Sequence, residues 1–336
     1  MNSGGKIKII FSIILFTAIT FLFPFNIFAE KNPEVSKFKA GFYYTVKKGD
    51  TLWDLSEQFS DSPWVWPELW GENEQLLNPH WIYPGEKIRI FHMDWLGKKR
   101  VTQKTIVEPA FYAYPQIERA GFIKKTAIKP VGSIFKAKDD KVMISAGDLV
   151  YIREESGAQL IKGDKYMIYR TICPITDEST NSYIGVQHLI IGQVKILKNE
   201  QGFVLANVLK SFRMIRKNDY IMPCEKKTSF IELKKSKKGL DGKIILSEEH
   251  QVMFESATIA FINKGNQDDV TTGQQYSIYR QEKGKIKSSG PKVILPPDEI
   301  GTLLVLRTEA ETSTVLITKS ERDIEIGTKI CYPLEK

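Results

Sequence analysis

Cysteine and histidine are scarce in this chain, and their spacing argues against the common metal and thiol chemistries. Only three cysteines and four histidines occur among 336 residues. The cysteines form no C-x-x-C pair and no zinc-type spacing, and no histidine lies in an H-E-x-x-H motif. We therefore expect no metal site and no cofactor. An odd cysteine count also leaves at least one thiol unpaired in an exported protein.

The sequence signatures of common hydrolases are missing as well. The chain has no G-x-S-x-G motif and no S-x-x-K near a matching partner motif. Cys173 precedes Pro174 and has no histidine in a nucleophile arrangement. Paired acids such as Glu248 and Glu249 would face opposite sides of a strand, or be solvated in a loop. We expect no catalytic residues and predict that the protein is not an enzyme.

A long apolar run lies at the N-terminus and has the pattern of an export signal. Lys6 and Lys8 precede the apolar residues 9–23, and Ala29 ends a plausible cleavage site. Residues 1–29 are therefore predicted to be a signal peptide, and no cysteine is present there to carry a lipid anchor. If uncleaved, this segment would be the chain's contact with a membrane, because its length approaches that of a bilayer span. We expect an exported protein in the periplasm or cell wall.

Charge is distributed unevenly. The net charge of +8 falls to +6 without residues 1–29, which hold two lysines. Residues 43–91 carry four basic and eight acidic residues, so the remainder is strongly basic. Nucleic acid is a poor partner for an exported protein. A solvated lysine-rich surface would explain the charge, and so would attraction to anionic envelope polymers or lipid headgroups.

The most specific pattern lies in residues 43–91. A short strand at 43–46 is followed by a sharp turn, a helix, a second helical stretch near 67–73 and a strand at 87–91. Asp50 or Thr51 can cap the first helix. The apolar face of that helix carries Leu52, Leu55 and Phe59.

This order of elements resembles the LysM domain, a module that binds glycans containing N-acetylglucosamine. The matching signature is Tyr44-x-Val46-x-x-Gly49-Asp50-Thr51-Leu52-x-x-Leu55-x-x-x-Phe59, then Asn73, then Ile82-x-Pro84-Gly85-x-x-Ile88-x-Ile90. The resemblance covers about one seventh of the chain and assigns a LysM domain to residues 43–92.

In LysM domains the sugar lies in a shallow groove between two loops, and the resemblance implies such a groove here. One wall would be formed by Gly49, Asp50, Thr51 and Leu52. The other would be formed by Asn78, Pro79, Trp81, Ile82 and Tyr83. An N-acetyl group needs polar partners for its amide and a small apolar pocket for its methyl group. Asn73 is expected to satisfy backbone groups within the module.

All six tryptophans lie between positions 53 and 95, which departs from the usual LysM pattern. They are Trp53, Trp64, Trp66, Trp70, Trp81 and Trp95. They either enlarge the core and pack the module on the rest of the chain, or line an extended glycan or protein surface. The sequence leaves both interpretations open.

Residues 93–130 form a predicted connector, interrupted by prolines, whose aromatic residues at 112–122 are expected to dock on a neighbouring domain. The chain beyond it repeats itself. Residues 163–170 match 273–280 at an offset of 110, and after one deletion Ile221 matches Ile330 at an offset of 109.

We interpret this repetition as two copies of one domain, at 131–224 and 241–334, joined through a lysine-rich segment. About six short strand-like runs in each copy predict a small closed barrel or compact sandwich. A disulfide between Cys224 and Cys331 is conceivable, because they end corresponding strands. The predicted fold class is α+β, with a LysM βααβ module followed by two tandem all-β domains.

Together these patterns predict a non-catalytic envelope protein. Its LysM domain would bind peptidoglycan or N-acetylglucosamine oligomers, and its β-domains would be a scaffold for an envelope protein partner. One alternative is a peptidoglycan hydrolase or amidase with an unrecognised site. The other is a structural component of an envelope or secretion assembly, in which the LysM-like fold binds protein.

Overall fold

The structure is a computed structural model of the chain and describes residues 39–60, 62–90, 110–155, 157–178, 180–285 and 292–334. The predicted signal peptide, Trp95 and the first part of the predicted connector lie outside these residues. No helix within the described ranges is long and apolar enough to cross a membrane.

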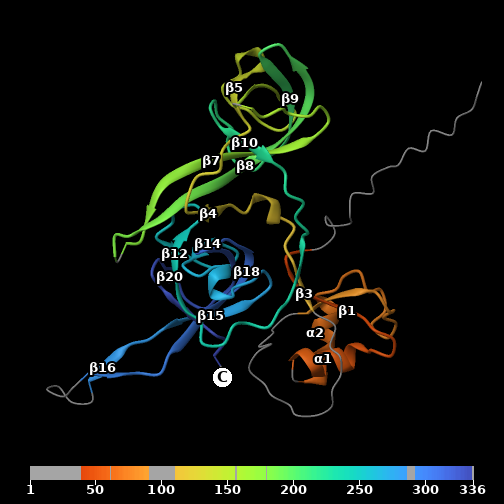
Figure 1. Cartoon of the computed structure of the whole chain (residues 1–336). Coiled ribbons are helices and arrows are strands. Elements are labelled where there is room, and N and C mark those ends of the chain that lie inside the picture. Colours follow the sequence, from red (N-terminus) through yellow and green to blue (C-terminus); the bar gives the residue numbers. More distant parts are fainter. Residues whose placement is uncertain are drawn as a thin grey trace, which may run out of the picture. The chain divides into compact units, whose positions relative to one another are not determined.

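The first part of the described chain has the predicted order of strand, helix, helix and strand (Figure 1). Its elements are β1 (Gly41–Thr45), α1 (Leu52–Ser60), η2 (Pro63–Val65), α2 (Trp66–Gly71) and β2 (Lys87–Ile90). β1 and β2 pair antiparallel, with Tyr44 opposite Ile88. Leu52, Leu55 and Leu69 from the helices pack on this pair and form the core of the module.

Two short strands from outside the module extend its sheet. They are β3 (Phe111–Ala113), from the predicted connector, and β11 (Phe230–Glu232), from the lysine-rich segment between the β-domains. The strand order is β11-β3-β1-β2. The connector continues as η3 (Ile117–Arg119) and β4 (Phe122–Lys124). Tyr112 and Tyr114 are buried with Leu304 and Leu306, so the prediction that the connector docks through its aromatic residues is confirmed.

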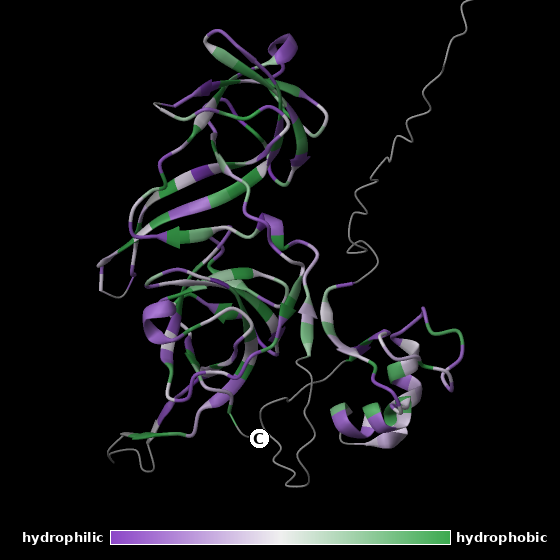
Figure 2. Cartoon of the chain, turned by 45° about the vertical axis from the view of Figure 1, so that its right-hand side comes forward, coloured by the Kyte–Doolittle hydropathy of each residue, from purple (hydrophilic) through white to green (hydrophobic). Residues whose placement is uncertain are grey.

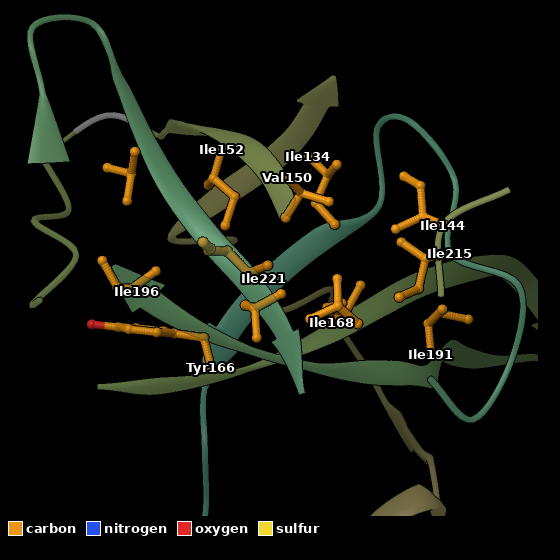
Figure 3. Packing of buried hydrophobic residues seen from close by; sticks show 14 of the residues in the cluster. Ile134, Ile144, Val150, Ile152, Tyr166, Ile168, Ile191, Ile196, Ile215 and Ile221 are labelled. Atoms are coloured by element: carbon orange, nitrogen blue, oxygen red, sulfur yellow. The ribbon is translucent and has the colours of Figure 1, made fainter. Parts of the chain in front are cut away.

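The next six strands close into a ring, which we call barrel 1. They are β5 (Gly132–Ala137), β6 (Leu149–Glu154), β7 (Lys165–Thr176), β8 (Tyr183–Glu200), β9 (Phe203–Ser211) and β10 (Tyr220–Pro223), with η4 (Lys138–Asp140) between β5 and β6. Pairing runs β5-β6-β9-β8-β7-β10 and returns to β5, and β4 adds to the free edge of β8. Isoleucine and valine side chains from all these barrel strands and their loops fill the interior (Figure 3).

The last part of the chain is a second closed barrel, which we call barrel 2. Its ring is β12 (Asp241–Ser247), β14 (Ile259–Ile262), β19 (Ser313–Ser320), β18 (Asp298–Thr308), β15 (Gln275–Arg280) and β21 (Lys329–Cys331). Additional elements are β13 (Met253–Phe254), η5 (Asn266–Asp268), β16 (Lys283–Lys285), β17 (Lys292–Ile294) and β20 (Ile324–Glu325). Figure 2 shows hydrophobic and hydrophilic segments interleaved along the strands of both barrels, as a filled barrel requires.

The two barrels share strand order and register at the offsets found in the sequence. Ile168 lies opposite Gly192 in barrel 1, as Ile278 lies opposite Gly301 in barrel 2. A Cβ on either glycine would lie 2.4 or 2.5 Å from a carbonyl oxygen of the neighbouring strand, so both positions exclude a side chain.

The turn predicted to be shared by the two copies is also present. Asn218 and Gly327 both have positive φ, at 70° and 86°. The α+β prediction is confirmed, and both β-domains are barrels rather than sandwiches.

Candidate functional site

The first predicted wall is the turn between β1 and α1. Gly49 has a φ of +97° and no atom within 4 Å of the position that its Cβ would take, so conformation rather than space requires glycine. The carboxylate of Asp50 accepts hydrogen bonds from the Lys47 backbone N–H at 2.8 Å and the Tyr44 hydroxyl at 3.0 Å. Asp50 therefore fixes the turn and does not cap the helix.

Thr51 is the residue that caps α1. Its Oγ1 accepts a hydrogen bond from the Asp54 N–H at 3.1 Å and donates to the Asp54 carboxylate at 2.7 Å. A threonine followed three residues later by an acid is the sequence signal that identifies this cap. The first bond within the helix joins the N–H of Leu55 to the carbonyl of Thr51 at 3.0 Å, which leaves the N–H groups of Leu52 and Trp53 without partners inside the helix.

Leu52 is only 2% exposed as a whole residue, and its side chain belongs to the module core. Leu52 therefore has almost no surface, backbone included, to offer to a ligand. This corrects any expectation that its side chain lines the wall.

The second predicted wall is the loop between α2 and β2. Oδ1 of Asn78 accepts from the His80 N–H at 2.9 Å, and its carbonyl accepts from the Trp81 N–H at 3.2 Å, which stabilises a tight turn. The side chains of Trp81 and Tyr83 are 67% and 58% exposed. Ile82 between them is half-buried and packs on the module core. Pro79 is half-buried too. The loop therefore presents two aromatic rings to solvent from an anchored backbone.

Backbone hydrogen bonds bring the two walls to the same end of the β1–β2 pair. The carbonyl of Val46 accepts from the Gly85 N–H at 2.8 Å, and the Val46 N–H donates to the carbonyl of Glu86 at 2.8 Å. Val46 therefore directly precedes the turn at 47–51 and also binds, through its carbonyl, the end of the loop at 78–85. The two predicted loops thus lie at the same end of the β1–β2 pair.

Comparison with known protein families agrees with this geometry: the LysM domain model matches residues 44–91. These residues form a LysM domain. A Bacillus subtilis (strain 168) protein described as "Uncharacterized protein YqbP" is 42% identical over 57 residues, which are 14% of this chain and 26% of that protein. The chain therefore spans about a quarter of that relative's length. A LysM domain supports carbohydrate binding of the peptidoglycan type.

Asn73 holds the LysM domain together from inside, as predicted. Its amide nitrogen donates to the Leu69 carbonyl at 2.7 Å and to the Arg89 carbonyl at 2.9 Å, and its Oδ1 accepts from the Arg89 N–H at 2.7 Å. All three partners are backbone groups of the helix end and of β2.

The tryptophans of the LysM domain divide between the two interpretations. Trp66 packs on the core, and Trp70 is tied by its indole N–H to the Leu76 carbonyl at 2.8 Å. Trp53 and Trp64 instead form an edge-to-face pair at the surface, with ring centroids 4.9 Å apart, and Trp64 is 76% exposed. Exposed indoles therefore lie both on the second wall and beside the helix.

Outside the LysM domain, the described residues contain no group of three or more His, Cys, Asp or Glu residues arranged to hold a metal ion. Cys224 and Cys331 are free thiols, so the conceivable bridge between them is not formed. Glu248 is wrongly predicted as a solvated acid: it is buried, and it accepts from the Gly121 N–H at 2.6 Å and from Arg213 at 2.8 Å. Burial raises the pKa of Glu248, although Arg213 and the Gly121 N–H partly offset this effect.

Proposed function

We propose that this protein is an exported, non-catalytic envelope protein that binds N-acetylglucosamine-containing glycan of peptidoglycan through the two loops of its LysM domain. The observation that carries the proposal is the pairing of the two walls. One wall supplies the backbone N–H of the exposed Trp53, which has no partner inside α1, and the other supplies exposed aromatic rings beside Ile82.

Each wall suits one part of an N-acetylated sugar. The N–H of Trp53, an exposed residue, lies in the first turn of α1 without a partner inside the helix and suits the carbonyl oxygen of an acetamido group. The rings of Trp81 and Tyr83 offer flat apolar faces for sugar C–H groups, while their polar edges remain available to hydroxyls. Gly49 has no side chain and lets the sugar approach the backbone closely.

Attachment of the LysM domain to the rest of the chain supports an adaptor function. β3 pairs with β1 on one side and with β11 on the other, so the LysM sheet continues into segments that flank the barrels. The Lys87 ammonium lies 4.0 Å from the centre of the Phe230 ring and adds a cation–π contact across this sheet. In our proposal the LysM domain holds the glycan, and the barrels present a surface to an envelope protein.

Titration with N-acetylglucosamine oligomers of four to six units, followed by calorimetry, tests the glycan part of the proposal. We expect Trp81→Ala combined with Tyr83→Ala to weaken binding at least about tenfold, which corresponds to about 1.4 kcal/mol. Trp64→Ala is the matched control, since it removes an equally exposed indole outside both walls. Absence of heat with the unaltered chain would contradict the proposal. Release of soluble muropeptides from sacculi would instead identify a hydrolase.

A further inference from the structure

One face, formed by matching positions in the two barrels, is covered by other strands on barrel 2 and is open on barrel 1. On barrel 2 it consists of Ile245 and Leu246 of β12, Phe261 of β14, and Ile326 after β20. These side chains pack against Ile123, Ile172, Ile175 and Ile184, which come from β4 and the extended β7–β8 hairpin. Barrel 2 thus shows how an extended segment docks on this face.

Subtracting the repeat offsets of 110 and 109 from these residue numbers gives the corresponding face of barrel 1. It consists of Phe135, Lys136, Tyr151 and Lys217. The match is exact in register, because Lys136 lies opposite Tyr151 as Leu246 lies opposite Phe261, and both strands are irregular at this point.

On barrel 1 this face is open among the described residues. Phe135 and Tyr151 are half-buried, with ring centroids 6.2 Å apart. Phe135, Lys136 and Lys217 line a pocket of about 620 Å³, together with the exposed Val142 and Met214. We call this surface the barrel 1 face.

The two faces also differ in charge. The pocket on barrel 1 carries four cations, Lys136, Lys141, Arg216 and Lys217, and one acid, Asp140. The corresponding positions on barrel 2 hold Leu246, Gln251, Glu325 and Ile326. Lys136 pairs with Asp140 at 2.9 Å and Lys141 with Asp148 at 2.7 Å. The side chains of Arg216 and Lys217 form no ion pair with any described residue.

We propose that the barrel 1 face binds an extended, acidic segment of a partner protein. Apolar side chains of that segment would pack on Phe135, Tyr151 and Val142, and its carboxylates would pair with Lys136, Arg216 and Lys217. A second copy's isoleucine-faced hairpin fits less well, because Lys136 and Lys217 stand where barrel 2 has Leu246 and Ile326, and covering them without partners would be costly. A phosphate-rich polymer would pair with the cations but leave the aromatic and aliphatic surface uncovered.

This inference rests on the proposed adaptor function for the existence of a partner, but it does not depend on glycan binding. The test uses the full chain and a fluorescein-labelled ten-residue peptide of alternating glutamate and valine, followed by fluorescence anisotropy. We expect saturable binding that weakens as salt concentration rises. We expect Lys136→Glu combined with Lys217→Glu to weaken it at least tenfold. Lys162→Glu combined with Lys165→Glu, at two exposed lysines of barrel 1 outside the pocket, is the matched control and should leave it unchanged.

Three kinds of result would overturn the proposal. The first is a lack of charge dependence, seen either as equal binding of a peptide with lysine in place of glutamate or as unchanged affinity in the Lys136, Lys217 variant. The second is tight binding of poly(glycerol phosphate) that the same variant abolishes, without peptide binding. The third is self-association in sedimentation that this variant abolishes, which would assign the face to a second copy. Failure of glycan binding with peptide binding retained would contradict the proposed function and leave this inference standing.

Discussion

The side-chain amide of Asn73 forms hydrogen bonds with both the backbone N–H and the backbone C=O of Arg89. The two hydrogen bonds are 2.7 and 2.9 Å long, and Asn73 is fully buried. A third bond to the Leu69 carbonyl ties the same amide to the end of α2. The side chain of Asn73 thus joins the end of α2 to β2.

Asn73→Ala should strongly destabilise the LysM domain. The substitution leaves buried backbone groups of Leu69 and Arg89 without partners, and we expect the free energy of unfolding to fall by about 2 to 4 kcal/mol. Tryptophan fluorescence during urea unfolding measures this selectively, because all six tryptophans lie between positions 53 and 95. Glu74→Ala, at an exposed neighbour, should leave the transition unchanged. An unaltered midpoint for Asn73→Ala would contradict the structural role assigned to it.

Gly49→Val should damage the first wall through backbone strain. A φ of +97° is strained for any L side chain and most for a β-branched one, so we expect a loss of about 1 to 3 kcal/mol in unfolding free energy. Glycan affinity should fall as well. Gly71→Ala is the control, because Gly71 has open space around it and lies in α2 without a left-handed φ. Equal stability of the two variants would show that the turn tolerates a different conformation.

His188 should make the stability of barrel 1 depend on pH. The side chain is fully buried, and its Nε2 accepts from the Ile128 N–H at 3.0 Å. Burial, helped by Lys124 and Arg307, lowers the pKa of His188 from 6.5 to about 4. Between these values the unfolded chain binds a proton that the folded chain does not, so stability falls as pH falls from about 6.5 to 4, by about 3 kcal/mol in all.

Urea unfolding followed by circular dichroism at several pH values measures this component, with His188→Gln as the comparison. The raised pKa of Glu248 acts in the opposite direction, because its penalty for burial is relieved as pH falls. Because Glu248 is present in both proteins, subtracting the pH profile of His188→Gln from that of the unaltered chain cancels the Glu248 contribution. Parallel pH profiles for the two proteins would contradict the assignment to His188.

Substitution by alanine should lower the stability of the protein strongly at Glu248 and only slightly at Glu249. Glu248 is buried and accepts from the Gly121 N–H and from Nη2 of Arg213, whereas Glu249 is exposed and accepts from Nε and Nη2 of the same guanidinium at the surface. Removing Glu248 leaves Arg213 partly unpaired in a buried position, and we expect a loss of about 3 kcal/mol. Glu249→Ala should have little effect. Similar thermal midpoints for both variants would show that the buried pair contributes no net stability.

Local patterns predicted the LysM domain well, because the helix periodicity of Leu52 and Leu55 and the turn at Gly49 depend on neighbouring residues. Of the two predicted helix caps, Thr51 is the one present, and Asp50 instead accepts from the hydroxyl of Tyr44, a tertiary partner six residues away that no local pattern indicates. The strands β3 and β11 were missed because each has three residues, and their pairing is decided by distant segments. The covering of barrel 2 by β4 and the β7–β8 hairpin is equally a tertiary property that no local pattern carries.

Co-sedimentation with purified peptidoglycan sacculi tests the central claim most directly. Point variants suit this measurement better than deletion of residues 43–91, because deletion would remove the strand that pairs with β3. We predict that the unaltered chain and Trp64→Ala pellet with sacculi, while Trp81→Ala combined with Tyr83→Ala remains in the supernatant. Pelleting of all three proteins to the same extent would contradict binding through the two walls, and failure of the unaltered chain to pellet would contradict peptidoglycan binding itself.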